Sequence, residues 1–193
     1  MKLLAFLFTL STSFSFGQTY WQQEVNYKID VAMNDEDHTL DATEEFEYVN
    51  NSPNVLNSIY VHLWPNAYKN GETALARQQY QGGETMLKYG PEEDKGNISG
   101  LDFKVDGVKA KWEFEEFNID IAIIELNQPL QPGGRIIVST PFTVKLPSGE
   151  ISRLGHIGQS YQITQWYPKP AVYDAEGWHQ MPYLNQGEFY SEY

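Results

Sequence analysis

Residues 25–48 read VNYKIDVAMNDEDHTLDATEEFEY, and two runs within them alternate between apolar and polar side chains. The first run begins at Val25 and continues with Tyr27, Ile29, Val31 and Met33. The second run carries its own period-two set, which consists of Leu40, Ala42, Glu44, Phe46 and Tyr48. Side chains that repeat every second residue share one face of a strand. The stretch therefore predicts two strands joined by a turn at Asn34–Asp37.

Further strands are expected on both sides of the middle of the chain. After a break at residues 50–54, Ile59, Val61 and Leu63 alternate again, which predicts a meander of antiparallel strands with one solvated face. The stretch 119–126 is more apolar than its neighbours and predicts another strand. The only helix candidate is short, over residues 74–80. The expected fold class is all-β, a sandwich-like arrangement of antiparallel sheets.

Two turns are predicted in the second half of the chain. Asp106-Gly107 follows an alternating stretch that ends at Val105, and the pair predicts a two-residue hairpin with Trp112 and Phe114 on its return strand. Residues 132–134, Pro-Gly-Gly, turn the chain into a strand at Ile136. Two prolines at 141 and 147 make the following stretch resemble an edge strand.

Composition limits the classes of partner. The 193 residues suffice for one sizeable domain, or for one domain and a piece of another, and the formal net charge is -13. Such acidity excludes nucleic acid as an expected partner, because phosphates are bound by clustered Lys and Arg. It equally disfavours an anionic membrane surface. No cysteine is present, so a Cys-ligated zinc ion or a thiol nucleophile is impossible.

The first 17 residues have the pattern of a secretory signal peptide. Lys2 precedes the apolar run Leu3–Leu10, and Ser15 and Gly17 form a small-x-small cleavage site, so the mature chain is expected to start at Gln18. The apolar run is too short for a membrane span. The alternative is a membrane anchor. Export to the periplasm, the cell surface or the medium is expected.

Candidate chemistry is sparse. The four histidines are His38, His62, His156 and His179, and none belongs to a His-Glu-x-x-His motif. His62 is expected in the core or in a pocket wall. A His156/His179 metal pair is conceivable, but zinc prefers three or four ligands. Adjacent acids such as Glu44/Glu45, Glu92/Glu93 and Glu115/Glu116 should point to opposite faces of a strand and be solvated.

Residues 158–173, GQSYQITQWYPKPAVY, are aromatic, rich in amides and almost uncharged. Two prolines make them unsuited to a helix or a central strand, so we expect a rigid segment that lines another part of the protein. Two interpretations fit the aromatic pairs at Trp64-Pro65, Trp166-Tyr167 and Trp178-His179. They form either a platform for sugars or the packing between a sheet and its neighbour.

Several of these stretches together resemble the N-terminal β-domain of the M1 family of zinc metallopeptidases, the aminopeptidase N group, in the exported form of Bacteroidetes-type bacteria. The resemblance covers residues 18–193, and its order along the chain is its most persuasive part. It rests on Tyr27–Val31 with Leu40–Glu44, on Ile59–Tyr68 (IYVHLWPNAY), on Leu130–Gly134 (LQPGG) and on Gln159–Tyr173.

The resemblance implies a saddle-shaped β-domain that caps a catalytic domain. In that family two His of a His-Glu-x-x-His motif and a downstream Glu hold the zinc ion, and a Gly-x-Met-Glu-Asn loop binds the free amine of the peptide. None of these motifs occurs in this chain, so the resemblance implies no metal and no catalytic residue here. Residues 187–193 resemble the opening of another strand, which suggests a fragment that continues into the zinc domain; the alternative is a genuine terminus.

One site residue follows from the resemblance. In the family, a Gln or Glu of this domain contacts the α-ammonium group of the substrate, nine residues before the Pro of a Phe-Pro-like pair. Tyr167-Pro168 matches that pair, which gives Gln159, with Gln162 as the second choice. The sequence departs from the family pattern at Lys169–Asp174 and at Thr164-Gln165. The competing expectations are a non-catalytic exported module that binds carbohydrate or protein, and a self-contained metalloenzyme.

Overall fold

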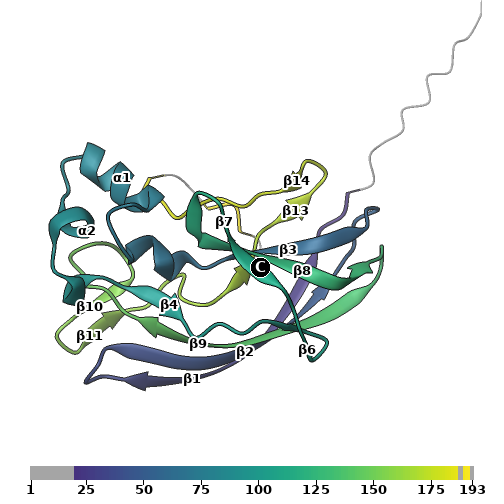
Figure 1. The fold of residues 1–193 in the computed structure, drawn as a ribbon, viewed down its shortest axis with the longest axis horizontal. Helices are drawn as coiled ribbons and strands as arrows, with labels where there is room; N and C mark the ends of the chain where they lie inside the picture. The colour runs from purple at the N-terminus through teal and green to yellow at the C-terminus, as the bar shows by residue number, and fades with distance from the viewer. Residues whose placement is uncertain (1–19, 187–188, 192–193) are drawn as a thin grey trace, which may run out of the picture.

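A computed structural model describes residues 20–186 and 189–191, and it is an all-β protein with two antiparallel sheets (Figure 1). The expected signal peptide, residues 1–17, lies outside the described residues. Of residues 187–193 only 189–191 are described, and these three are not in a strand. Within the described part of the chain, no helix has the length and apolarity needed to cross a membrane.

Sheet A has the strand order β1-β2-β9-β5-β6, and β4 also pairs with β9. Its strands are β1 (Glu24–Asn34), β2 (Thr39–Val49), β9 (Arg135–Lys145), β5 (Lys104–Val105), β6 (Val108–Lys109) and β4 (Asn97–Ser99). The expected first hairpin is confirmed, because β1 pairs with β2 from Glu24↔Val49 to Asn34↔Thr39. Asn34 caps the turn by accepting hydrogen bonds from the backbone N–H groups of Glu36 and Asp37.

Sheet B has the order β12-β3-β8-β7, and two small hairpins lie outside both sheets. Its strands are β12 (Lys169–Pro170), β3 (Leu56–His62), β8 (Asn118–Leu130) and β7 (Trp112–Glu115). The hairpins are β10 (Gly155–Ile157) with β11 (Ser160–Gln162), and β13 (Tyr173–Asp174) with β14 (Gly177–Trp178). The short helices lie between β3 and β4: η1 (Trp64–Tyr68), α1 (Ala74–Gln81), α2 (Met86–Tyr89) and η2 (Glu92–Asp94).

The two sheets enclose one hydrophobic core, and Figure 1 shows them as two layers, with β1, β2 and β9 in one and β3, β7 and β8 in the other. Sheet A contributes the expected period-two face of β2, including Leu40 and Phe46, together with Val138 of β9. Sheet B contributes Ile59 and Ile124, which are fully buried. The alternating pattern of the sequence therefore identified the core-facing positions of these strands.

Three topological expectations were wrong. The third strand, β3, does not extend a meander but starts the second sheet, since residues 50–55 carry the chain across. The hairpin at Asp106-Gly107 exists, but its return strand is β6, and Trp112 and Phe114 belong to β7 in sheet B. Ala110, directly after β6, is buried and donates its N–H to Phe103 O, and the chain then continues into β7 of sheet B.

The proline-flanked stretch after Ile136 is likewise not an edge strand. It is the continuation of β9, which lies centrally in sheet A beside β2. Pro141 is accommodated because it falls between the pairing of β9 with β5 and its pairing with β4. At that position β9 has a ladder neighbour on one side only, which is where a sheet tolerates proline.

Candidate functional site

Residues 158–173, called here the closing segment, connect the two sheets. Trp166 packs on Phe142 of sheet A with ring centroids 5.9 Å apart, and Tyr167 meets Tyr27 of β1 at 5.4 Å. The strand β12, which begins two residues after Tyr167, pairs with β3 and forms an edge of sheet B. The segment thus lines the core at the open side of the sandwich, as its composition predicted. Gln165 has a φ of 53°, an unusual backbone conformation for a residue that is not glycine.

Gln159 occupies the tip of the hairpin β10–β11. Ile157 pairs with Ser160, so Gly158 and Gln159 form a two-residue loop. Gly158 has a φ of 56°, which suits glycine at the first position of a type II′ turn. The Gln159 side chain is exposed, and its Nε2 donates a hydrogen bond of 3.1 Å to Asp35 Oδ2 in the β1–β2 turn. This hydrogen bond uses the amide nitrogen and leaves the amide oxygen outside it.

The second choice, Gln162, is exposed at the other end of the hairpin, opposite Gly155. Gln159 bonds to Asp35 in the β1–β2 turn. Among the described residues, the Gln162 side chain forms no such hydrogen bond to that turn. Of the two glutamines, Gln159 is therefore the one whose position is fixed by a polar contact.

A group of polar side chains gathers around Gln159, and we call it the turn cluster: Asp35, His38, His156, Gln159 and Tyr161. The imidazoles of His38 and His156 stack, with centroids 3.5 Å apart and planes 20° from parallel. Tyr161 donates its hydroxyl to Asp35 O at 3.3 Å and lies 2.8 Å from His38 Nδ1. Sequence reasoning missed His38 and Asp35, because their approach to the hairpin depends on contacts across more than a hundred positions.

The pairing of His156 with His179, which the sequence left as conceivable but disfavoured, is not found. His156 stacks on His38, whereas His179 Nε2 lies 2.7 Å from Asp174 Oδ1 in the hairpin β13–β14. Tyr190 donates to the other oxygen of Asp174 at 3.1 Å. The part of the chain that the structure describes contains no cluster of three or more His, Asp or Glu side chains suited to hold a metal ion.

His62 has the expected core role. It is buried, its ring stacks on Trp64 at 4.4 Å, and its Nε2 accepts a hydrogen bond from Met181 N. Burial, followed by the nearby positive charge of Lys169, lowers the pKa of His62 to about 3. The imidazole is therefore neutral, and it packs between β3 and the residues that follow β14.

Glu44 corrects the expectation that the adjacent acids are solvated. Glu44 and Glu45 do point to opposite faces of β2, but Glu44 faces the core and is 2% exposed. Neither of its carboxylate oxygens has a hydrogen-bond partner. Burial raises the pKa of Glu44 to about 9, so the side chain is protonated at neutral pH. Burial, and then the charge of Glu44 when it is present, raises the pKa of Tyr167 in the closing segment.

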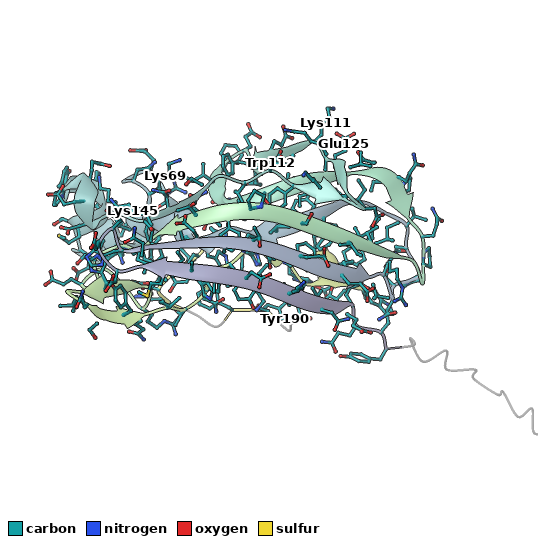
Figure 2. All side chains as sticks on the ribbon, turned by 90° about the horizontal axis from the view of Figure 1, so that it is seen from below. Lys69, Lys111, Trp112, Glu125, Lys145 and Tyr190 are labelled. Carbon is teal, nitrogen blue, oxygen red and sulfur yellow. The ribbon has the colours of Figure 1, made fainter. Side chains whose placement is uncertain are left out.

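The aromatic pairs pack against the sheets. Trp64 is buried, Trp166 contacts sheet A, and Trp178 contacts Tyr48 and Tyr60 at 6.2 and 5.5 Å. This agrees with packing rather than with an exposed sugar platform at these positions. Trp112 behaves differently, because it borders a surface groove of about 450 Å³ over β3, β7 and β8. The groove is lined by Asn57, Ser58, Lys111, Trp112, Glu113, Ile123 and Glu125, and Figure 2 shows three of them together.

The fold thus defines a two-sheet antiparallel β-domain with a polar turn cluster at one end. No protein-family model matches the chain, and a search of curated proteins finds no relative.

Proposed function

We propose that this chain is the N-terminal capping domain of an exported, M1-like zinc aminopeptidase and that it helps to form the pocket for the substrate N-terminus. The zinc ion and the catalytic residues belong, in this proposal, to a catalytic domain that this sequence does not contain. The proposal starts from the resemblance of residues 18–193 to the N-terminal domain of that family. The antiparallel two-sheet fold is compatible with it.

The observation that supports the proposal most is the pairing of Gln159 with Asp35 at an exposed hairpin tip. The amide oxygen of Gln159 can accept a hydrogen bond, and the Asp35 carboxylate adds negative charge 3.1 Å from the amide nitrogen. Together they suit a primary ammonium group, which is a donor and a cation. Because the pair lies at the surface, it can reach a substrate held by another domain.

The test is kinetic and uses the complete enzyme. Gln159→Ala should raise KM for an aminoacyl anilide about tenfold, as expected for loss of one charge-assisted hydrogen bond at a partly solvated site. Gln162→Ala is the matched control, since it removes a nearby exposed glutamine, and it should leave KM unchanged. Unchanged kinetics in Gln159→Ala would remove this residue from the site. The coding sequence beyond Tyr193 should encode Gly-x-Met-Glu-Asn followed by His-Glu-x-x-His.

A second candidate function is a non-catalytic binding module, and the groove beside Trp112 favours it. An aromatic ring next to the Lys111–Glu125 ion pair (3.3 Å) and the polar Asn57 and Ser58 resembles the mixed apolar and hydrogen-bonding surface that sugars need. Glycan binding by the purified protein that is lost in Trp112→Ala would favour this function over the first.

A further inference from the structure

Strand β1 forms one edge of sheet A, outside β2 (Figure 1). It pairs with β2 along all 11 of its residues, and in the described part of the chain no backbone–backbone hydrogen bond joins it to any other element. In an antiparallel pair, only every second residue directs its N–H and C=O groups at a given neighbour. The other backbone groups of β1 therefore point outward along the edge.

This edge lacks most of the features that usually protect one. Exposed edge strands are commonly kept short or interrupted by prolines, bulges and charges. β1 is long, contains no proline, and pairs with β2 without a shift of register. Val31 and Met33 belong to its apolar face, yet they are 51% and 43% exposed. A regular edge with exposed apolar side chains is a template on which another strand can pair.

The charges of β1 are complementary to those of a second, antiparallel copy of the same strand. A twofold axis between two such copies passes through a pair of identical residues, because only then do side chains on the same face lie opposite each other. An axis at Ile29 places Lys28 of each copy opposite Asp30 of the other. An axis at Lys28 or at Asp30 would instead oppose two like charges, which is unfavourable.

Lys28 and Asp30 are available for such pairing. Both side chains are exposed, and neither forms an ion pair among the described residues. Within the chain, Lys28 lies opposite Glu45 of β2. In the paired arrangement Lys28 would have an acidic neighbour on both sides, and the charges would alternate in sign across the joined strands.

The apolar face supports the same register. With the axis at Ile29, the exposed Val31 lies opposite Tyr27 of the second copy, and the exposed Met33 lies opposite its Val25. Tyr27, Val25 and Ile29 are half-buried in the single chain. Cross-strand pairs of aromatic, branched and other apolar side chains stabilise a sheet. One register therefore satisfies the charges on one face and covers the apolar residues on the other.

We propose that β1 is an interface for a second copy of this chain. The two copies form a twofold-symmetric dimer in which their β1 strands pair antiparallel about Ile29, so that two copies of sheet A become one continuous sheet. This interface is separate from the turn cluster and from the groove beside Trp112, and it does not rest on the proposed function.

The experiment is sedimentation velocity of the purified protein over a series of concentrations. The mass should rise from that of one chain to that of two. Lys28→Glu and Asp30→Lys each oppose like charges at two symmetry-related pairs, and each should raise the Kd of the dimer at least about tenfold. The double variant Lys28→Glu/Asp30→Lys restores opposite charges and should recover the dimer. Lys104→Glu, on the exposed face of β5 in the same sheet, is the matched control and should dimerise like the parent protein.

A second measurement uses the absence of cysteine from the chain. In Ile29→Cys the two thiols lie opposite each other, with Cβ atoms about 4.5–5.5 Å apart, and mild oxidation should link the copies by a disulfide. In Val31→Cys the two thiols are four positions apart, about 13 Å along the strands, and should not link. The proposal is overturned if the parent protein stays monomeric across the series, if the double variant does not recover the dimer, or if both cysteine variants link equally.

Discussion

Glu44 is a carboxylic acid enclosed by the inner face of sheet A. Its strand neighbours are Ile29 on β1 and Thr140 on β9, and the aromatic ring of Tyr167 belongs to the segment that closes the sandwich next to it. An unpaired charge at such a place is strongly unfavourable, so the folded state holds the proton. The group therefore links the stability of the domain to pH.

Glu44→Gln should stabilise the protein at neutral pH. The folded-state pKa of about 9 lies above the ordinary value of 4.5, so folding is unaffected by this group below pH 4.5 and is increasingly opposed as pH rises toward 9. The expected gain is about 3 kcal/mol at pH 7. Urea unfolding of both proteins between pH 4.5 and 8 measures the difference, which should grow with pH.

Glu45→Gln provides the control for this series. Glu45 is the exposed neighbour on the opposite face of β2, so the substitution removes the same charge without touching the core. Its effect on the free energy of unfolding should be small and nearly constant with pH. An equal gain in both variants would attribute the effect to net charge and would contradict the role of burial.

The sequence predicted the side of β2 on which Glu44 lies, since it shares the period-two set of Leu40 and Phe46. It did not predict burial, because that depends on a segment about 120 positions later in the chain. The same limit applies to the turn cluster. The resemblance selected Gln159, but nothing local indicates that Asp35 and His38 lie beside it.

At the scale of elements, Asn50 links the segment after β2 to the turn between β8 and β9. Its side-chain oxygen accepts from Gln23 Nε2 and from Ser52, and its Nδ2 donates to Asn54 O and Leu130 O. Its backbone N–H and carbonyl bond Gly134 and Gly133 in the β8–β9 turn. The residue thus fixes the crossing from sheet A to sheet B next to the turn that returns the chain to sheet A.

Asn50→Ala should destabilise the protein by roughly 3 kcal/mol, because several buried donors and acceptors lose their partner together. Thermal and urea unfolding measure the loss. Asn57→Ala is the comparison, since Asn57 is exposed on β3, and it should shift stability by less than about 0.5 kcal/mol. Similar losses in both variants would mean that Asn50 does not hold the crossing.

Strand existence was predictable here, but sheet membership was not. Alternation identified β2, which has one fully buried face, and β1, whose first half has a half-buried face, while β8 was identified by its higher apolar content and is buried at consecutive positions 120–122. The assignment of Trp112 and Phe114 failed because a two-residue strand, β6, ends at Lys109 before the chain changes sheets. Backbone pairing between distant strands, which period-two patterns do not encode, decides such crossings.

At the scale of the whole molecule, Trp178 connects both layers. Its ring contacts Tyr48 of sheet A and Tyr60 of sheet B, and Tyr173 of its own hairpin lies 5.0 Å away. Trp178→Ala should lower the free energy of unfolding by about 2–4 kcal/mol, because a large, half-buried ring that contacts both sheets is lost. Chemical denaturation measures the change.

Phe117→Ala is the matched aromatic control. Phe117 is 72% exposed in the β7–β8 turn, so the loss of its ring should leave stability almost unchanged. If Trp178→Ala were equally neutral, the hairpin β13–β14 would not hold the two layers together.

The pairing of β2 with β9 has a consequence for how the protein reaches its folded state. The paired residues, from Thr39↔Lys145 to Val49↔Arg135, are about 100 positions apart in the chain. During synthesis, β2 cannot complete its pairing with β9 until Lys145 has been added to the chain. Domains dominated by such distant pairings fold in milliseconds to seconds rather than microseconds. A chain whose central strand pairing forms this late therefore has an incomplete sheet A for most of its synthesis.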